Sequence, residues 1–447
     1  MKRGVVDFIT LGCSKNLVDA ERVMQQLEAA GWTCVHDPEE PKGEVCVINT
    51  CGFIGDAKEE SIQMILQMAE RKKKGKLRKL IVMGCLSERY KAELEEELPE
   101  VDRYYGKFDF MELTKELKIK NEKLKTGCAA YERKLTTPKH YAYLKISEGC
   151  NRMCSYCAIP LITGRHTSRP MEEILDEVRW LVSQGVKELN VIAQDLSSYG
   201  LDLFRQPSAV NHQKRHLLPE LIEAIANVPG VEWIRLHYAY PTDFPEELLD
   251  VMAKHDNICK YLDIALQHCT DHMLGLMRRH ITRAEQDALI RKIREKVPGI
   301  CIRTTLLVGH PGETEADFEE LKQWVKEMRF ERMGCFAYSD EEGTYANKHY
   351  KDDIPEDVKQ ARAAELMAIQ QEISGALMAQ KVGTTQRVII DRQEGNYWIG
   401  RTQYDSPEVD CEVLISRQPS AVSIQIGDFQ DVEITKAEEF DLYGIVC

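Results

Sequence analysis

Short apolar runs alternate with amphipathic stretches along the first 130 residues. Three of the apolar runs have the length of strands: Val5–Leu11, Val45–Asn49 and Leu80–Met83. Each is followed by apolar residues at helical spacing, over Asn16–Ala30, Ala57–Lys74 and Glu88–Leu98. Strands that alternate with helices in this way predict a doubly wound parallel sheet. We therefore assign residues 1–130 to an N-terminal domain of the α/β class.

Residues 131–140 lose this periodicity and predict a linker, and a second, longer alternation then covers residues 141–375. Its candidate strands are Tyr141–Ile146, Glu188–Ala193, Trp233–Tyr238, Tyr261–Leu266, Cys301–Val308 and Arg332–Tyr338. Helical patterns such as Met171–Ser183 and Asp317–Met328 separate them. About six strand–helix units predict a partial (β/α)6 barrel, because about eight are needed to close a full one.

Residues 380–447 have a different pattern, in which short alternating strands are separated by Gly and Pro turns. Segments such as VGTTQRVIIDR and CEVLISR predict a small all-β barrel. This region holds six Lys and Arg residues against twelve Asp and Glu residues. The third domain is therefore expected to be acidic.

Composition narrows the class of protein and its partners. The chain has 447 residues with 43% hydrophobic and 30% charged residues, which is ordinary for a globular protein. It contains neither an apolar run of about 18 residues nor an apolar signal core behind Met1, so we expect a cytoplasmic protein without a membrane partner. A net charge of −14 makes RNA binding less favourable than binding of a basic protein, such as a ribosomal protein.

The sharpest chemical signal is a C-x3-C-x2-C cluster formed by Cys150, Cys154 and Cys157. It follows the first predicted barrel strand, at the end of the barrel where such enzymes place their chemistry. Thiolates are the preferred ligands of iron–sulfur clusters, and three of them leave one iron open for a non-protein ligand. The alternatives are ordinary loop cysteines or a zinc site, but zinc sites favour four ligands in paired spacings.

Three further cysteines are dispersed along the N-terminal domain: Cys13, Cys51 and Cys85. Each follows an apolar run and is adjacent to a glycine, so all three are expected at the carboxyl ends of successive parallel strands. Each could instead be a buried core cysteine. Convergence on one sheet edge, where glycine lets a bulky ligand approach the backbone, favours a second three-cysteine site.

The cluster in its barrel position resembles the radical S-adenosylmethionine superfamily, and the domain order resembles that superfamily's methylthiotransferase family. Stretches that carry the resemblance include TLGCSKNLVDAE, KISEGCNRMCSYCAIP, MRRHITR and GRTQYDSPEVD. They look like the RimO type, which modifies the β-carbon of an aspartate in small-subunit ribosomal protein S-twelve. The sister type modifies a prenylated adenosine of transfer RNA and is the alternative. The acidic third domain fits the basic ribosomal protein better.

The resemblance implies two 4Fe-4S clusters, one on each cysteine set, S-adenosylmethionine as cofactor, a C-terminal barrel of the TRAM type, and external electron and sulfur donors. Candidate cofactor contacts are Tyr156, Gln194, Asp195 and Arg303. Asp195 could instead have a turn or N-cap role, and Arg303 could pair with a carboxylate of a neighbouring strand. Two residues depart from the family pattern, which has glycine at His280 and an aromatic residue at His310.

Overall fold

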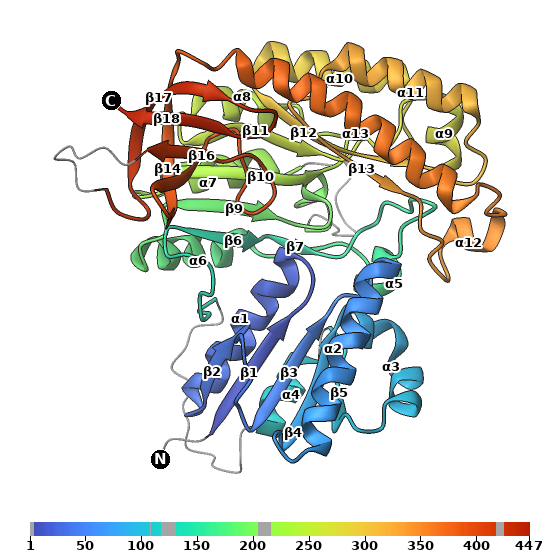
Figure 1. Cartoon of the computed structure of the whole chain (residues 1–447), viewed down its shortest axis with the longest axis vertical. Helices are drawn as coiled ribbons and strands as arrows, with labels where there is room; N and C mark the ends of the chain where they lie inside the picture. Colours follow the sequence, from blue (N-terminus) through green and yellow to red (C-terminus); the bar gives the residue numbers. More distant parts are fainter. Residues whose placement is uncertain (1–3, 108, 118–130, 204–215, 417–423) are drawn as a thin grey trace, which may run out of the picture.

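The computed structural model describes residues 4–107, 109–117, 131–203, 216–416 and 424–447. In Figure 1 the N-terminal domain lies below a larger α/β unit, and a small β-barrel lies at one end of that unit. The hexapeptide RQPSAV occurs twice, at 205–210 and 417–422, and both copies lie outside the described residues. The described helices include none that is both long and apolar enough to cross a membrane.

The N-terminal domain is a five-stranded parallel sheet with strand order β2-β1-β3-β4-β5. Its elements are β1 (Val5–Thr10), α1 (Ser14–Ala29), β2 (Thr33–His36), β3 (Val45–Thr50), α2 (Gly55–Lys73), β4 (Lys79–Gly84), α3 (Cys85–Glu97), β5 (Arg103–Tyr104) and α4 (Phe110–Leu117). Alternate residues of β3 face opposite sides: Val45 and Val47 pack with α1 and α4, while Cys46 and Ile48 pack with α2 and α3. The doubly wound parallel sheet is confirmed.

The central unit is an open six-stranded sheet with order β13-β12-β11-β10-β9-β6, in which every neighbouring pair is parallel. Its strands are β6 (Tyr141–Lys145), β9 (Glu188–Ile192), β10 (Trp233–Ala239), β11 (Ile258–Ile264), β12 (Cys301–Val308) and β13 (Arg332–Ala337). All six predicted strands form, so the partial barrel is confirmed. Strand β11 begins three residues before its prediction, because Ile258 already pairs with β10 across an apolar run that Lys260 interrupts.

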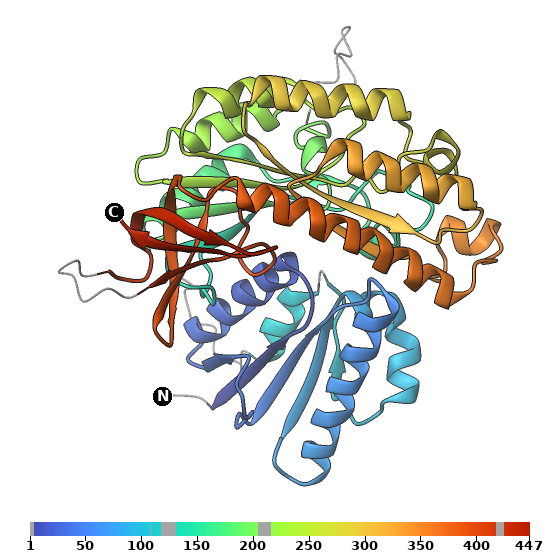
Figure 2. The same cartoon turned by 45° about the horizontal axis from the view of Figure 1, so that its top comes forward.

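Helices cover the outer face of this sheet and bury one continuous apolar core. They are α6 (Met171–Ser183), α7 (Leu218–Ala226), α8 (Glu247–Lys254), α10 (Arg283–Lys296), α11 (Glu315–Met328) and α13 (Glu356–Ala379). Helices α9 (Asp271–Leu276) and α12 (Tyr345–His349) instead share a smaller apolar cluster with Leu307 and Tyr338, at the carboxyl ends of β12 and β13. Short elements lie between β6 and α6 and after β9: β7 (Ser147–Glu148), α5 (Ile159–Thr163), β8 (Thr167–Ser168) and the 3-10 turn η1 (Leu196–Ser198). Figure 2 shows α13 running along the sheet to the C-terminal barrel.

The C-terminal barrel is closed in the order β14-β15-β16-β18-β17. Its strands are β14 (Thr385–Glu394), β15 (Tyr397–Thr402), β16 (Val413–Ser416), β17 (Phe429–Ala437) and β18 (Leu442–Val446). The barrel docks on the amino ends of the central strands, where Arg401 pairs with Glu188 at 2.7 Å and Phe429 packs edge-on against Trp233 at 4.8 Å. The small all-β barrel is confirmed.

Candidate functional site

The three dispersed cysteines meet at the carboxyl edge of the N-terminal sheet. Cys13 precedes α1, Cys51 follows β3, and Cys85 begins α3 directly after β4. Burial raises the pKa of Cys85 to about 12; nearby Lys107 opposes this shift, whereas negative charge on Cys13 and on Cys51 adds to it. The three thiols are therefore electrostatic neighbours, as expected from a parallel sheet.

Glycines let the chain pack closely around these cysteines, because neighbouring atoms occupy the space that a side chain would need. A Cβ added at Gly12 would lie 3.1 Å from the Cys51 Cβ, and one at Gly52 would lie 2.7 Å from the backbone nitrogen of Leu86. Gly84 has a φ of 105°, and a Cβ there would lie 2.5 Å from Asn49 Oδ1. A glycine-lined edge with three thiols has the donor chemistry that an iron–sulfur cluster requires.

The second cysteine set lies in the loop between β7 and α5, at the carboxyl end of the central sheet. Burial raises the pKa of Cys150 to about 12, and the charges of Asp195 and Cys154 act in the same direction. Gly149 begins this loop with a φ of 80°, and a Cβ there would lie 2.2 Å from the carbonyl oxygen of Arg165. In the described part of the chain, no three His, Cys, Asp or Glu side chains are placed to hold a single metal ion.

Arg279 contacts this set and was not found from the sequence. Its guanidinium is 2% exposed and donates to Cys154 Sγ at 3.2 Å and to the Tyr156 hydroxyl at 3.3 Å. The Tyr240 hydroxyl lies 3.4 Å from the same sulfur. Both residues are far from Cys154 in sequence; the only available signal for Arg279 was its place in the MRRHITR stretch.

The structure brings three of the four candidate cofactor contacts to the cysteine loop. Tyr156 lies within it, and Asp195 accepts a hydrogen bond from Arg152 Nε at 2.8 Å. Gln194 donates to Glu148, and its buried Oε1 has no hydrogen-bond partner among the described residues. Asp195 precedes the 3-10 turn, but its carboxylate makes no capping hydrogen bond.

Arg303 lies elsewhere, at the amino end of β12. It pairs with Asp263 of β11 at 3.5 Å and with Asp410 of the C-terminal segment at 3.4 Å. This is the pairing with a neighbouring strand carboxylate that the sequence left open as the alternative. The contacts of Arg303 therefore place it at the docking face of the C-terminal barrel.

The two departures from the family pattern have different settings. His310 is fully buried, and burial lowers its pKa to about 4, so the ring is neutral near pH 7. Its Nδ1 lies 3.0 Å from the carbonyl oxygen of Pro311 and therefore carries the proton, which leaves Nε2 to accept from the Ser155 hydroxyl at 2.9 Å. His280 is exposed with a φ of 54°, a conformation that favours glycine.

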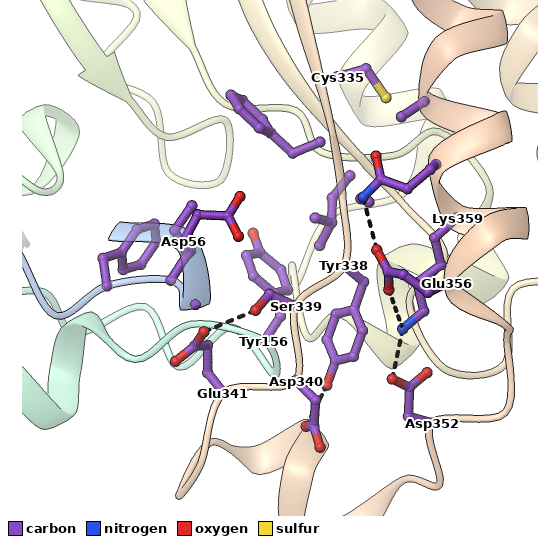
Figure 3. A pocket seen from close by; sticks show the side chains of 18 of the residues that line it. Asp56, Tyr156, Cys335, Tyr338, Ser339, Asp340, Glu341, Asp352, Glu356 and Lys359 are labelled. Carbon is purple, nitrogen blue, oxygen red and sulfur yellow. Dashed lines mark hydrogen bonds and ion pairs between the residues drawn. The ribbon is translucent and has the colours of Figure 1, made fainter. Parts of the chain in front are cut away.

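A cavity of about 740 Å³ lies at the carboxyl ends of β12 and β13, and none of the six cysteines is among its lining residues. Its lining residues come from the loop after Cys51 (Phe53–Asp56), from the cysteine loop (Tyr156) and from the central strands and α13. Figure 3 shows Asp56 and Tyr156 across the cavity from Glu356 and Lys359. Pockets of this volume suit a ligand of nucleoside cofactor size.

Comparison with known proteins identifies the family. Three family models match consecutive parts of the chain: Uncharacterized protein family UPF0004 at residues 5–106, the Radical SAM superfamily at 144–325 and the TRAM domain at 382–447. Among solved structures, the radical S-adenosylmethionine methyltransferase TsrM from Kitasatospora setae superposes with a TM-score of 0.54 at 14% identity, covering 88% of this chain and 79% of TsrM. That likeness shows a shared fold.

Curated relatives match along nearly their whole length, and two of them illustrate the match. The ribosomal protein uS12 methylthiotransferase RimO of Phocaeicola vulgatus is 63% identical, covering 100% of both chains. The RimO of Bacteroides thetaiotaomicron is also 63% identical, covering 99% of this chain and 98% of its own. With these relatives, a radical SAM domain and a TRAM domain, the chain belongs to the RimO family of radical S-adenosylmethionine methylthiotransferases.

Proposed function

We propose that this protein replaces a hydrogen on the β-carbon of an aspartate in ribosomal protein uS12 with a methylthio group. The observation that carries the proposal is the pair of three-cysteine sets on the facing edges of the N-terminal sheet and the central sheet. The full-length relatives named for uS12 favour this substrate over transfer RNA. Because its substrate is a ribosomal protein, we place the enzyme in the cytoplasm.

The proposed cofactors fit the residues present. Cys13, Cys51 and Cys85 would hold one 4Fe-4S cluster, and Cys150, Cys154 and Cys157 would hold the other. When bound, the clusters and S-adenosylmethionine supply the methyl group, the sulfur and the radical that removes the substrate hydrogen, with electrons and sulfur replenished by external donors. The domains proposed for these tasks are residues 1–130, residues 141–375 after the linker 131–140, and residues 380–447.

The chain's own residues position and enclose the reactants. Tyr156 lies at the cavity wall, and the buried, unpaired Gln194 Oε1 and Asp195 Oδ1 are free acceptors beside the cysteine loop. Unpaired buried acceptors are costly, so donors of a bound cofactor would satisfy them. Ion pairs clamp the N-terminal domain against the central sheet: Lys58 and Arg89 both bind Glu341, at 2.7 and 3.0 Å, and Lys107 binds Glu148 at 2.7 Å. This clamp helps to exclude water from the space between the sets.

The test is anaerobic reconstitution of the full chain followed by iron and sulfide counting and a uS12 assay. The wild type should bind about eight irons, and the Cys13→Ala/Cys51→Ala/Cys85→Ala variant about four. The wild type alone should increase the mass of uS12 by one methylthio group in place of one hydrogen. About four irons in both proteins, or modification of transfer RNA in place of uS12, would overturn the proposal.

A further inference from the structure

Lys15 is a buried cation beside the first cysteine set. It lies two residues after Cys13, in the first turn of α1, and is 7% exposed. Its Nζ lies 3.2 Å from the centroid of the Tyr238 ring, and in the described part of the chain it makes no hydrogen bond or ion pair with a side chain or carbonyl. A cation in the first turn also opposes the helix dipole.

The acidic groups around Lys15 already have other partners. Asp19 of α1 pairs with Lys145, and Asp263 of β11 pairs with Arg303 at 3.5 Å. Glu148 binds both Lys107 and Lys145. The charge of Lys15 helps to lower the pKa of His237 and opposes the rise that burial causes in the pKa of Asp263, but no hydrogen bond or ion pair joins either residue to its ammonium group. An ammonium group buried without a carboxylate is unfavourable unless a ligand supplies one.

The position of Lys15 relates it to both cysteine sets. Tyr238 lies at the end of β10, with a φ of 65° and 38% of its surface exposed. Two residues later on the same strand end, the Tyr240 hydroxyl contacts Cys154 Sγ at 3.4 Å. Lys15 therefore extends from the loop of Cys13 to the end of β10, which borders the second cysteine set. A substrate carbon that reacts with groups held at both sets has to lie in this region.

We propose that Lys15 binds the side-chain carboxylate of the uS12 aspartate that is modified. The inference rests on the proposed function and adds a specificity-determining residue to it. In aspartate the β-carbon is bonded directly to the carboxyl carbon, so fixing the carboxylate also fixes the reacting carbon. A charge-assisted hydrogen bond from an ammonium group in a partly dry site selects a carboxylate over the carboxamide of asparagine.

The test measures the affinity of reconstituted full-length enzyme for uS12 with aspartate or asparagine at the modified position, which mass spectrometry of the wild-type product identifies. The wild type should bind the aspartate form at least about tenfold more tightly, a difference of about 1.4 kcal/mol. Lys15→Met and Lys15→Gln should bind both forms equally, and Lys15→Arg should retain part of the preference. Lys254→Met, which removes an exposed lysine on α8, should behave as wild type.

Iron content and affinity for S-adenosylmethionine are measured for each variant. Retention of the aspartate preference in Lys15→Met or Lys15→Gln at wild-type iron content would overturn the inference. So would a change in cofactor affinity alone, because Lys15 would then bind the cofactor's carboxylate. If Lys15→Met or Lys15→Gln loses iron, the aspartate preference is judged from the variant that keeps it. A wild type that modifies uS12 but binds both forms equally would also overturn it. A wild type that leaves uS12 unmodified would instead overturn the proposed function.

Discussion

Individual side chains around Cys154 determine the electrostatic setting of the second cysteine set. Arg279 donates to the sulfur, and its guanidinium also lies 4.0 Å from the centroid of the Tyr240 ring. The flanking residues Arg278 and His280 have φ values of 57° and 54°, so the loop bends sharply to bury the arginine between them. Residues that donate to cluster sulfurs tune the reduction potential of the cluster.

Arg279→Gln is expected to make the potential of the cluster at Cys150, Cys154 and Cys157 more negative. A positive charge near the sulfur stabilises the reduced, more negative cluster, so its removal favours the oxidised form. We expect kcat to fall about 10- to 100-fold, with little change in KM for uS12. An EPR-monitored redox titration checks the potential. The control is Arg278→Gln, whose guanidinium lies against Tyr345; an unchanged potential in Arg279→Gln at full iron content would contradict the assignment.

At the scale of elements, the loops at the strand ends depend on a few backbone positions. Gly149 turns the chain from β7 into the cysteine loop at a φ of 80°, and the carbonyl of Arg165 occupies the space of a side chain. Gly164, in the segment that returns to β8, also has a positive φ of 68°, but nothing lies within 4 Å of an added Cβ. Alanine substitutions at these two glycines therefore distinguish the effect of a steric clash from the effect of backbone strain.

Gly149→Ala is expected to disrupt the cysteine loop and leave the N-terminal set intact. Iron content should fall from about eight to about four per chain, and cleavage of S-adenosylmethionine should be lost. Gly164→Ala should keep full iron content, because it adds only backbone strain, about 1–3 kcal/mol for a φ of 68° with a ψ of −154°, and no steric contact. Iron counting and a cofactor-cleavage assay check both variants, and equal iron content in the two would show that the contact with Arg165 does not matter.

Element type and order followed from hydrophobic periodicity, whereas short elements did not. Strands β2 and β5 and helix α4 were missed, because runs of two to eight residues carry too little periodicity to be distinguished from loops. The meeting of Cys13, Cys51 and Cys85 could be predicted because parallel strands share a carboxyl edge. The contact of Arg279 with Cys154 spans 125 residues and has no local signal. Arg303 was expected in the site because its strand was known, but it lies near the amino end of that strand, where it pairs with Asp263 and Asp410.

At the scale of the whole molecule, the acidic residues of the C-terminal barrel divide into two groups. Asp391, Glu408, Asp405 and Asp410 face the central sheet, where they bind His140, Tyr141, Arg332 and Tyr261 respectively. Others, including Asp431 and Glu433 of β17, are exposed. Only the exposed group can attract a basic protein, so the acidity counted from sequence overstates the charge available for docking.

Asp431→Asn/Glu433→Gln is expected to lower kcat/KM for uS12 several-fold at low ionic strength, because two attractive charges are lost during encounter. The difference from wild type should shrink at high salt. Glu95→Gln/Glu96→Gln on α3 makes the same change in net charge on an exposed face of the N-terminal domain and is the matched control. Steady-state kinetics at two salt concentrations check this; equal kcat/KM in both variants would assign uS12 docking to another surface.

The ion pairs between the central sheet and the C-terminal barrel also determine whether the barrel can be exchanged between related enzymes. Glu188 is fully buried and holds Arg235 of its own sheet and Arg401 of the C-terminal barrel at 2.9 and 2.7 Å. A C-terminal barrel taken from a distant relative would leave Glu188 and Arg332 facing unmatched groups in a dry environment, at a cost of several kcal/mol. Replacing the C-terminal barrel alone, from residue 380 onward, is therefore not expected to transfer substrate preference. A working chimera would have to carry both the barrel and the residues of the central sheet that pair with it.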